Sequence, residues 1–419
     1  LSVTKQKKST VEESLLRFGA HMSLRKTIWK PSTERKNSSS MSLFMKWLEA
    51  ERSLKFVDFH KLWNWSVNDL EAFWRSIWDY FELTSSTPIL KVLDEEKMPG
   101  ASWFTGAHVN IVHEIFKNLE EKRDKTAVSF RSETLGDGVL TWEELESKTN
   151  SLVIKLKELG VQKGDRVVAI LPNTPHSLVA FCATASIGAI WSLCAPDMGE
   201  TAILDRFKQI KPKVLICQDS YVYAGKLINK VNSLKNIIKN LPSLSHTIVV
   251  KIENNQLTEK HLEWDNIMRL KGESQIEMVP FDHPLWIVYS SGTTGNPKPI
   301  VHGHGGILVE MTKQSLHMDL TNKDHFCWLT SSGWIMWNAQ LVALLRKCSV
   351  AMFDFAPNYP DFLEVWRKVD AENLTYFGAG AAFFNSCMKS NITPKNEFSF
   401  DKLRSIGATG SPLSQEGYI

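Results

Sequence analysis

The chain contains 419 residues, of which 43% are hydrophobic and 23% are charged. This length exceeds one ordinary domain, and the composition is that of a globular protein able to bury a sizeable core. The formal net charge of +3 is small and the basic residues are dispersed, which excludes the basic footprint of a nucleic-acid-binding protein.

The first part of the chain predicts an extension followed by helices. Residues 1–24 are rich in Lys and Ser and predict a loosely ordered segment. No secretory signal is visible, because residues 1–40 are polar and contain no apolar core region. The first residue is Leu1 rather than Met, so we expect the sequence to be part of a longer gene product.

Residues 25–100 predict a helical N-terminal segment. Ser66, with Asp69 three residues later, is expected to cap a helix. Apolar residues then recur at helical spacing along one face, at Leu70, Phe73, Trp74, Ile77, Trp78 and Phe81. An aromatic stripe of this kind indicates a packing surface rather than a ligand site.

From residue 101 to 419, strand, turn and helix patterns alternate, which predicts an α/β fold with mostly parallel sheets flanked by helices. Thr141 and Glu144 predict a capping box for a helix that Gly160 ends. The uncharged window of residues 167–196 is long enough to raise the question of a membrane span. Because Pro172 and Pro175 interrupt it, we predict a buried strand, helix and strand instead, and no membrane span.

The most informative stretch begins with the apolar residues 285–289, which predict a strand buried on both faces. Two glycines and four hydroxyl side chains follow, and Lys298 then adds a cation: Ser290, Ser291, Gly292, Thr293, Thr294 and Gly295. Closely spaced backbone N–H groups and hydroxyls can surround phosphate oxygens. The spacing is not that of a Walker A loop, and the alternative is a flexible surface loop.

Three further groups of residues are candidates for a site. His302 and His304 would share one side of an extended segment and permit a metal pair, but no third ligand is evident, so structural or substrate-positioning roles are favoured. The bulky groups of Trp334 and Trp337 beside the amide of Asn338 suit a small acyl pocket. Gly378 is a second candidate wall, because a glycine lets a ligand approach the backbone.

Several of these motifs resemble known enzymes. The loop from Ser290 to Lys298 resembles the phosphate-binding signature of the adenylate-forming superfamily. Trp29-Lys30-Pro31-Ser32, Trp103-Phe104-Thr105-Gly106-Ala107 and Leu204-Asp205-Arg206-Phe207 are similar to segments of the acetoacetyl-CoA synthetase family, and the resemblance extends over residues 25–419. The fold implied is the large AMP-binding domain of that superfamily.

The resemblance also implies a function. A carboxylate, acetoacetate, would react with ATP in the presence of Mg²⁺ to give an acyl-adenylate, and coenzyme A would then displace AMP. The loop with Lys298 would hold phosphates, and the loop containing Gly410, Ser411 and Pro412 would lie against adenine. Trp334, Trp337, Asn338 and Gly378 would form the acyl pocket. Such an enzyme is a ligase of lipid and ketone-body metabolism, and the six widely spaced cysteines indicate reduced thiols in the cytoplasm.

This chain also departs from the family pattern. Lys347 and Phe355 stand where the family usually has Gly, and Ala379-Gly380 replaces Thr-Ser. The adenylation lysine, the acidic magnesium-binding motif and the mobile C-terminal domain of the family are expected beyond Ile419, so no catalytic residue and no metal ligand are assigned. The alternatives are an acetyl- or propionyl-CoA synthetase and a non-catalytic relative that binds nucleotide.

Overall fold

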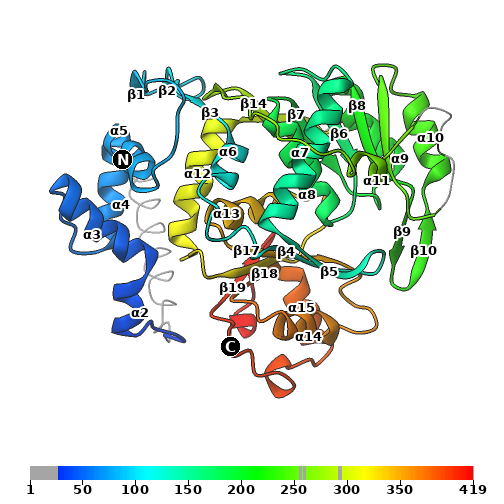
Figure 1. The fold of residues 1–419 in the computed structure, drawn as a ribbon. Coiled ribbons are helices and arrows are strands. Elements are labelled where there is room, and N and C mark those ends of the chain that lie inside the picture. The colour runs from blue at the N-terminus through cyan, green and yellow to red at the C-terminus, as the bar shows by residue number, and fades with distance from the viewer. Residues whose placement is uncertain (1–26, 254–256, 258–260, 291–294, 419) are drawn as a thin grey trace, which may run out of the picture.

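The computed structural model describes residues 27–253, 257, 261–290 and 295–418. Two large sheets dominate the fold, with helices between them and on their outer faces, and a helical segment packs on one side (Figure 1). This arrangement confirms the predicted α/β class with mostly parallel sheets. The predicted division of the chain at residues 24 and 100 stays a prediction.

The first large sheet has seven strands in the order β12-β11-β8-β6-β7-β14-β15. All neighbouring pairs are parallel except β14 and β15, which are antiparallel. Its strands are β6 (Arg166–Ile170), β7 (Ile190–Cys194), β8 (Val214–Gln218), β11 (His246–Val250), β12 (Leu262–Glu263), β14 (Pro284–Ser290) and β15 (Lys298–Gly303).

The second large sheet has six strands in the order β19-β18-β16-β17-β4-β5, and only its β4–β5 pair is antiparallel. Its strands are β4 (Thr126–Ser132), β5 (Gly136–Thr141), β16 (His325–Trp328), β17 (Ser349–Asp354), β18 (Tyr376–Gly380) and β19 (Ser405–Thr409). Three antiparallel pairs complete the strands: β1 (Lys91–Leu93) with β2 (Trp103–Thr105), β3 (His108–Val109) with β13 (Val279–Pro280), and β9 (Ser220–Tyr223) with β10 (Lys226–Asn229).

The helices form layers around these sheets. The N-terminal helices are α2 (Thr33–Ser38), α3 (Ser40–Arg52), α4 (Phe59–Asn68) and α5 (Leu70–Tyr80). The others are α6 (Ile111–Phe116), α7 (Trp142–Glu158), α8 (Pro175–Ser186), α9 (Glu200–Ile210), α10 (Val231–Lys239), α11 (Trp264–Ile267), α12 (His304–His317), α13 (Ala339–Leu345), α14 (Leu363–Ala371) and α15 (Ala381–Lys389). Short 3₁₀ helices are η1 (Ile335–Asn338), η2 (Pro394–Asn396) and η3 (Glu416–Tyr418).

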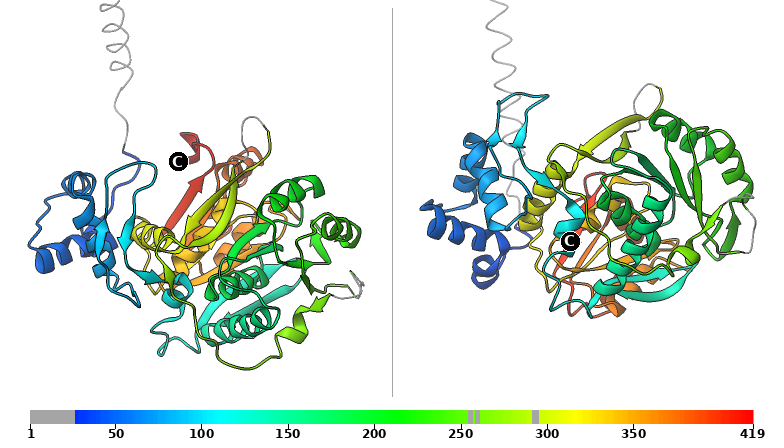
Figure 2. Two further views of the ribbon diagram at one scale, coloured as in Figure 1. Left: turned by 90° about the horizontal axis from the view of Figure 1, so that it is seen from above. Right: turned by 45° about the horizontal axis from the view of Figure 1, so that its top comes forward.

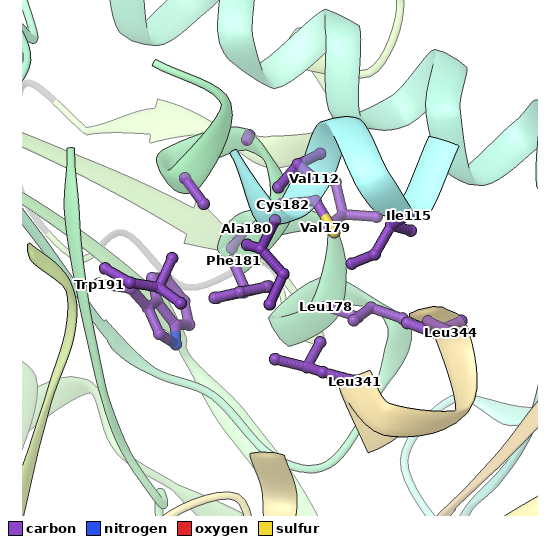
Figure 3. Packing of buried hydrophobic residues seen from close by; sticks show 14 of the residues in the cluster. Val112, Ile115, Leu178, Val179, Ala180, Phe181, Cys182, Trp191, Leu341 and Leu344 are labelled. Carbon is purple, nitrogen blue, oxygen red and sulfur yellow. The ribbon is translucent and has the colours of Figure 1, made fainter. Parts of the chain in front are cut away.

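The central layer explains why the uncharged window is so apolar. Helix α8 is buried along its length, and Phe181 and its neighbours pack among side chains of α6, α13 and β7 (Figure 3). Its polar side chains bond back to the helix, as Thr184 does to the Ala180 carbonyl at 2.8 Å. The predicted strand, helix and strand are therefore confirmed. Among the helices that the structure describes, none combines the length and apolar character needed to cross a bilayer.

Capping residues set several helix boundaries. The capping box of Thr141 and Glu144 is confirmed at the start of α7, and Gly160 adopts a positive φ of 73° just after that helix. The predicted cap at Ser66 is wrong, because Ser66 lies inside α4 and its hydroxyl donates to the Trp63 carbonyl. The carboxylate of Asp69 accepts the Ala72 N–H and caps α5 instead.

The aromatic stripe of α5 packs as predicted. Ile77 and Trp78 are buried, and a cluster containing Phe44 and Ile77 closes against Leu316 of α12. The N-terminal helices therefore lie beside α12 at one side of the molecule (Figures 1 and 2). The Arg35 guanidinium also donates to the Arg404 carbonyl at 3.0 Å, which ties α2 to the start of β19.

Candidate functional site

The predicted phosphate loop closes a β-hairpin. Strand β14 ends at Ser290 and its antiparallel neighbour β15 begins at Lys298, directly opposite Ser290 (Figure 2). The predicted strand is confirmed, but it is buried only over its first half, because β7 pairs with it at Trp286 and the rest continues outward with β15. Ser291, Gly292, Thr293 and Thr294 lie outside the described residues.

The end of this loop is a turn held by a glycine and a hydrogen bond. Gly295 has a φ of +124°, a conformation that suits glycine. The Pro297 carbonyl accepts a hydrogen bond from the Gln209 side chain of α9 at 2.9 Å, which anchors the loop exit. Lys298 is exposed, and among the described residues its ammonium group has no hydrogen-bond or ion-pair partner. The hairpin therefore presents the unpaired positive charge of Lys298 beside Ser290.

Next to this hairpin lies a cavity of about 330 Å³, here called the tryptophan cavity. Its wall includes four indoles and several polar groups: Trp191, Trp286, Trp334, Trp337, Ser290, Arg206, His302 and Asn338. The predicted acyl-pocket residues Trp334, Trp337 and Asn338 thus come together around one space. The cavity is bounded by Ser290, so a ligand inside it would lie beside the phosphate-loop candidate.

A second cavity of about 300 Å³ shares the walls Ser332 and Trp334 with the tryptophan cavity. It lies at the carboxyl ends of β6, β7 and β17, where open α/β sheets commonly bind ligands. Asp354 of β17 and Tyr221 of β9 contribute to its lining. We call it the strand-end cavity. Two co-substrates could meet across the shared wall.

The glycine-rich loop after β19 approaches the same tryptophan. A methyl group added at Gly410 would lie 3.6 Å from Trp334, and one added at Gly380 would lie 3.8 Å from it. Gly410 has a φ of +89°, and Ser411 and Pro412 follow on the surface. The loop expected to contact adenine therefore lies beside the tryptophan that lines both cavities.

Gly378 lies apart from the other acyl-pocket candidates. It lies inside β18, and a methyl group there would overlap the Trp328 indole at 2.2 Å. Among the described residues, those lining the two cavities do not include Gly378. The structure thus brings three of the four acyl-pocket candidates together, whereas Gly378 makes room for a core tryptophan.

His302 and His304 have separate partners. The Trp286 indole donates to Nδ1 of His302 at 2.8 Å. His304 begins α12, is fully buried, and its Nδ1 accepts the Ile111 N–H at 3.4 Å. The expected extended segment is therefore interrupted by a helix start. Within the described ranges no group of three or more His, Cys, Asp or Glu side chains could hold a metal ion.

Asp354 carries the most perturbed carboxyl group near the two cavities. Burial raises its pKa from 3.8 to about 6, against the opposing effect of the Ser132 hydroxyl, which donates to Oδ2 at 2.7 Å. A native pKa above the unfolded one means that the native state binds more protons between about pH 4 and pH 6. Stability contributed by this group is therefore present in acid and is lost as the pH rises through that window.

We expect Asp354→Asn to be more stable than the wild type at pH 7 by about 1–3 kcal/mol, because each pKa unit is worth about 1.4 kcal/mol. The advantage should disappear near pH 4. Urea unfolding of both proteins at the two pH values measures it, with Asp361→Asn, at an exposed surface position, as the control. A pH-independent difference would contradict the proposed protonation of Asp354.

Comparison with known proteins agrees with this geometry. A family model for AMP-binding enzymes matches residues 115–418. The chain belongs to this family. A second model, the acetyl-coenzyme A synthetase N-terminus, matches residues 59–115, which include α4 and α5. The AMP-binding region therefore contains both large sheets, the hairpin and the glycine-rich loop.

Individual relatives are similar over nearly the whole of this chain. Acetoacetyl-CoA synthetase of Xenopus tropicalis is 32% identical over 94% of this chain and 60% of its own length. Malonamoyl-CoA synthetase of Penicillium aethiopicum is 29% identical over 92% of this chain and 58% of its own length. The structure of acetoacetyl-CoA synthetase from Streptomyces lividans matches with a TM-score of 0.91 at 36% identity, covering 94% of this chain and 61% of that one. The chain spans about 60% of the length of these relatives.

Sequence reasoning missed some cavity residues. Trp191 and Trp286 were not site candidates, although both line the tryptophan cavity. Asp354 and Asn173 line the strand-end cavity and were not proposed either. The available signal was their position, because Asn173 and Asp354 lie at the carboxyl ends of strands β6 and β17, where ligands commonly bind.

Proposed function

We propose that this AMP-binding enzyme takes part in the ATP-dependent activation of acetoacetate, first to acetoacetyl-adenylate and then to acetoacetyl-CoA. The observation that carries the proposal is the position of the tryptophan cavity. It lies between the hairpin that presents Lys298 and the loop that contains Gly410. A carboxylate in this cavity would lie beside nucleotide phosphates at the hairpin.

The relatives support a particular kind of acid. The acetoacetyl and malonamoyl groups for which the similar synthetases are named both carry a carbonyl group on carbon 3. The tryptophan cavity has a volume of about 330 Å³, and its wall combines four indoles with polar side chains that include His302 and Asn338. Such a cavity suits a short acid that has one additional oxygen to bind.

The residues divide the substrates among them. Lys298 and Ser290, with Ser291, Gly292, Thr293, Thr294 and Gly295, would hold the phosphates of ATP. Gly410, Ser411 and Pro412 would contact adenine, and Trp334, Trp337 and Asn338 would hold the acyl group. Mg²⁺ would arrive bound to the ATP phosphates. Coenzyme A would enter from the strand-end cavity, because its wall is shared with the acyl site.

The protein's part in this chemistry is positioning and charge neutralisation. The reaction forms a bond between the carboxylate and the α-phosphate while pyrophosphate leaves, so negative charge must be stabilised on the phosphates. The exposed ammonium group of Lys298 can supply such stabilisation. A cytoplasmic location and a role in ketone-body and fatty-acid metabolism belong to the same proposal. Six free, buried cysteines agree with a reducing compartment.

A panel of acids tests the proposal. Carboxylate-dependent ATP–pyrophosphate exchange by the full-length gene product should be at least about tenfold faster with acetoacetate than with butyrate at equal subsaturating concentration. The reason is that a polar group left unpaired by butyrate costs roughly 1–3 kcal/mol. Acetate or propionate as the best substrate would instead identify an acetyl- or propionyl-CoA synthetase. Nucleotide binding without exchange for any acid would identify a non-catalytic relative.

A further inference from the structure

The tryptophan cavity contains a histidine whose proton position is fixed by a neighbour. Trp286 of β14 and His302 of β15 are direct cross-strand partners, and their rings meet edge to face at 6.1 Å. The Trp286 indole N–H donates to Nδ1 of His302 at 2.8 Å. An indole nitrogen can only donate, so Nδ1 of His302 must be the accepting, unprotonated nitrogen.

The other nitrogen must then carry the ring proton. Burial lowers the pKa of His302 below its usual 6.5, so the imidazole is neutral at neutral pH. A neutral imidazole has one N–H and one accepting nitrogen, and Trp286 occupies the accepting one. Nε2 of His302 is therefore a hydrogen-bond donor, and within the described part of the chain it has no partner.

The rest of the cavity wall also offers donors. Trp191 and Trp337 are each 2% exposed, and their indole N–H groups have no acceptor among the described residues. The Asn338 side-chain amide uses one of its two N–H donors on the Ile335 carbonyl, at 3.0 Å. A cavity with unsatisfied donors favours a ligand that brings acceptor oxygens.

We propose that the Nε2–H group of His302 donates to the carbonyl oxygen on carbon 3 of the acid, so that His302, held by Trp286, determines specificity for 3-oxo acids. This inference rests on the proposed function. Indole faces would contact the carbon chain, and the carboxylate would point toward the hairpin. A saturated acid of equal length would leave this donor without a partner, which is a larger penalty than a lost contact between apolar groups.

The tautomer is measured directly by nitrogen-15 NMR of histidine side chains in the 419-residue chain. His302 should show a protonated Nε2 and an unprotonated Nδ1 at pH 7.5, and its resonances are assigned by their loss in His302→Leu. In Trp286→Phe the indole donor is gone, so the two tautomers should become mixed. A protonated Nδ1 in the wild type would overturn the inference whatever the enzyme's activity.

The specificity role is measured by the ratio of kcat/KM for acetoacetate to that for butyrate in the exchange assay. His302→Leu should lower this ratio about tenfold or more, while KM for ATP changes less than about twofold. His302→Gln keeps an N–H donor and should retain part of the preference. His317→Leu is the control, because His317 lies on α12 beside Phe59 and does not line the tryptophan cavity.

The outcomes separate the two proposals. An unchanged ratio in an active His302→Leu enzyme would overturn the role of His302 and leave the proposed function intact. An equal loss of rate with both acids would assign His302 to general positioning and would likewise overturn the specificity role. Failure of the wild type to use any 3-oxo acid would overturn the proposed function and, with it, the substrate role of His302.

Discussion

Replacing Lys298 with alanine is expected to lower the rate of acid-dependent ATP–pyrophosphate exchange by about 100-fold or more. Lys298 is exposed at the first position of β15, opposite Ser290, and has no partner among the described residues. Its charge is therefore available to phosphate oxygens. Charge-assisted contacts are among the strongest hydrogen bonds, and stabilising charge in a transition state is worth orders of magnitude in rate.

The same substitution should leave the fold unchanged, since an exposed side chain without protein contacts contributes little to stability. The melting temperature is measured beside the exchange rate, and Lys239→Ala on the exposed face of α10 serves as the control. Full exchange activity in Lys298→Ala would contradict the proposal that the hairpin binds the phosphates of ATP. A large fall in melting temperature would show that Lys298 has a structural role instead.

Replacing Lys347 with alanine is expected to destabilise the protein by about 2–4 kcal/mol. The Lys347 ammonium group donates to the Glu114 and Ile115 carbonyls at 2.6 and 2.7 Å, near the carboxyl end of α6. It also lies near the buried carboxylate of Glu114, which opposes the lowering of its pKa by burial. Hydrogen bonds to a charged group contribute about 1.5–3 kcal/mol, and removing one partner leaves buried acceptors unpaired.

The backbone at Lys347 supplies a second comparison. Its φ of +58° is a left-handed conformation just after α13, where glycine is normally preferred. Lys347→Gly should therefore be about 1 kcal/mol more stable than Lys347→Ala, although both lose the ammonium contacts. Urea midpoints of the three proteins decide this, provided that the m-values agree. Equal stabilities of the glycine and alanine variants would contradict the strain argument.

Local sequence signals predicted the elements of the fold well. The capping residues of α7, the apolar strand β14 and the buried helix α8 depend on hydrogen bonds and periodicity within a few residues. These local signals did not predict which of two nearby capping residues would begin the helix. Ser66 and Asp69 are both good capping residues, and Asp69 prevailed because α4 continues through Ser66 to Asn68.

The sequence also predicted a set of site residues, and their roles stay predictions. The glycines, hydroxyls and Lys298 after residue 289 indicated a phosphate-binding loop, and the residues around Trp334 indicated a pocket. These indications were possible because hydrogen-bonding capacity, charge and bulk depend on residue type. Phe355 shows the limit of such reasoning. Lys347 and Phe355 both stand where the resemblance implies glycine, but of these two residues only Lys347 has a positive φ, of 58°.

Only the tertiary structure decided how these residues combine. The antiparallel register of β14 and β15 places Trp286 against His302, and the meeting of η1 with the loop after β19 places Trp334 beside Gly410. Neither pairing follows from spacing along the chain. The first depends on the register of the hairpin, and the second on the strand order of the second sheet, which brings the loops after β16 and β19 to one edge. The hydrogen bond from Trp286 determines the tautomer of His302, and burial raises the pKa of Asp354.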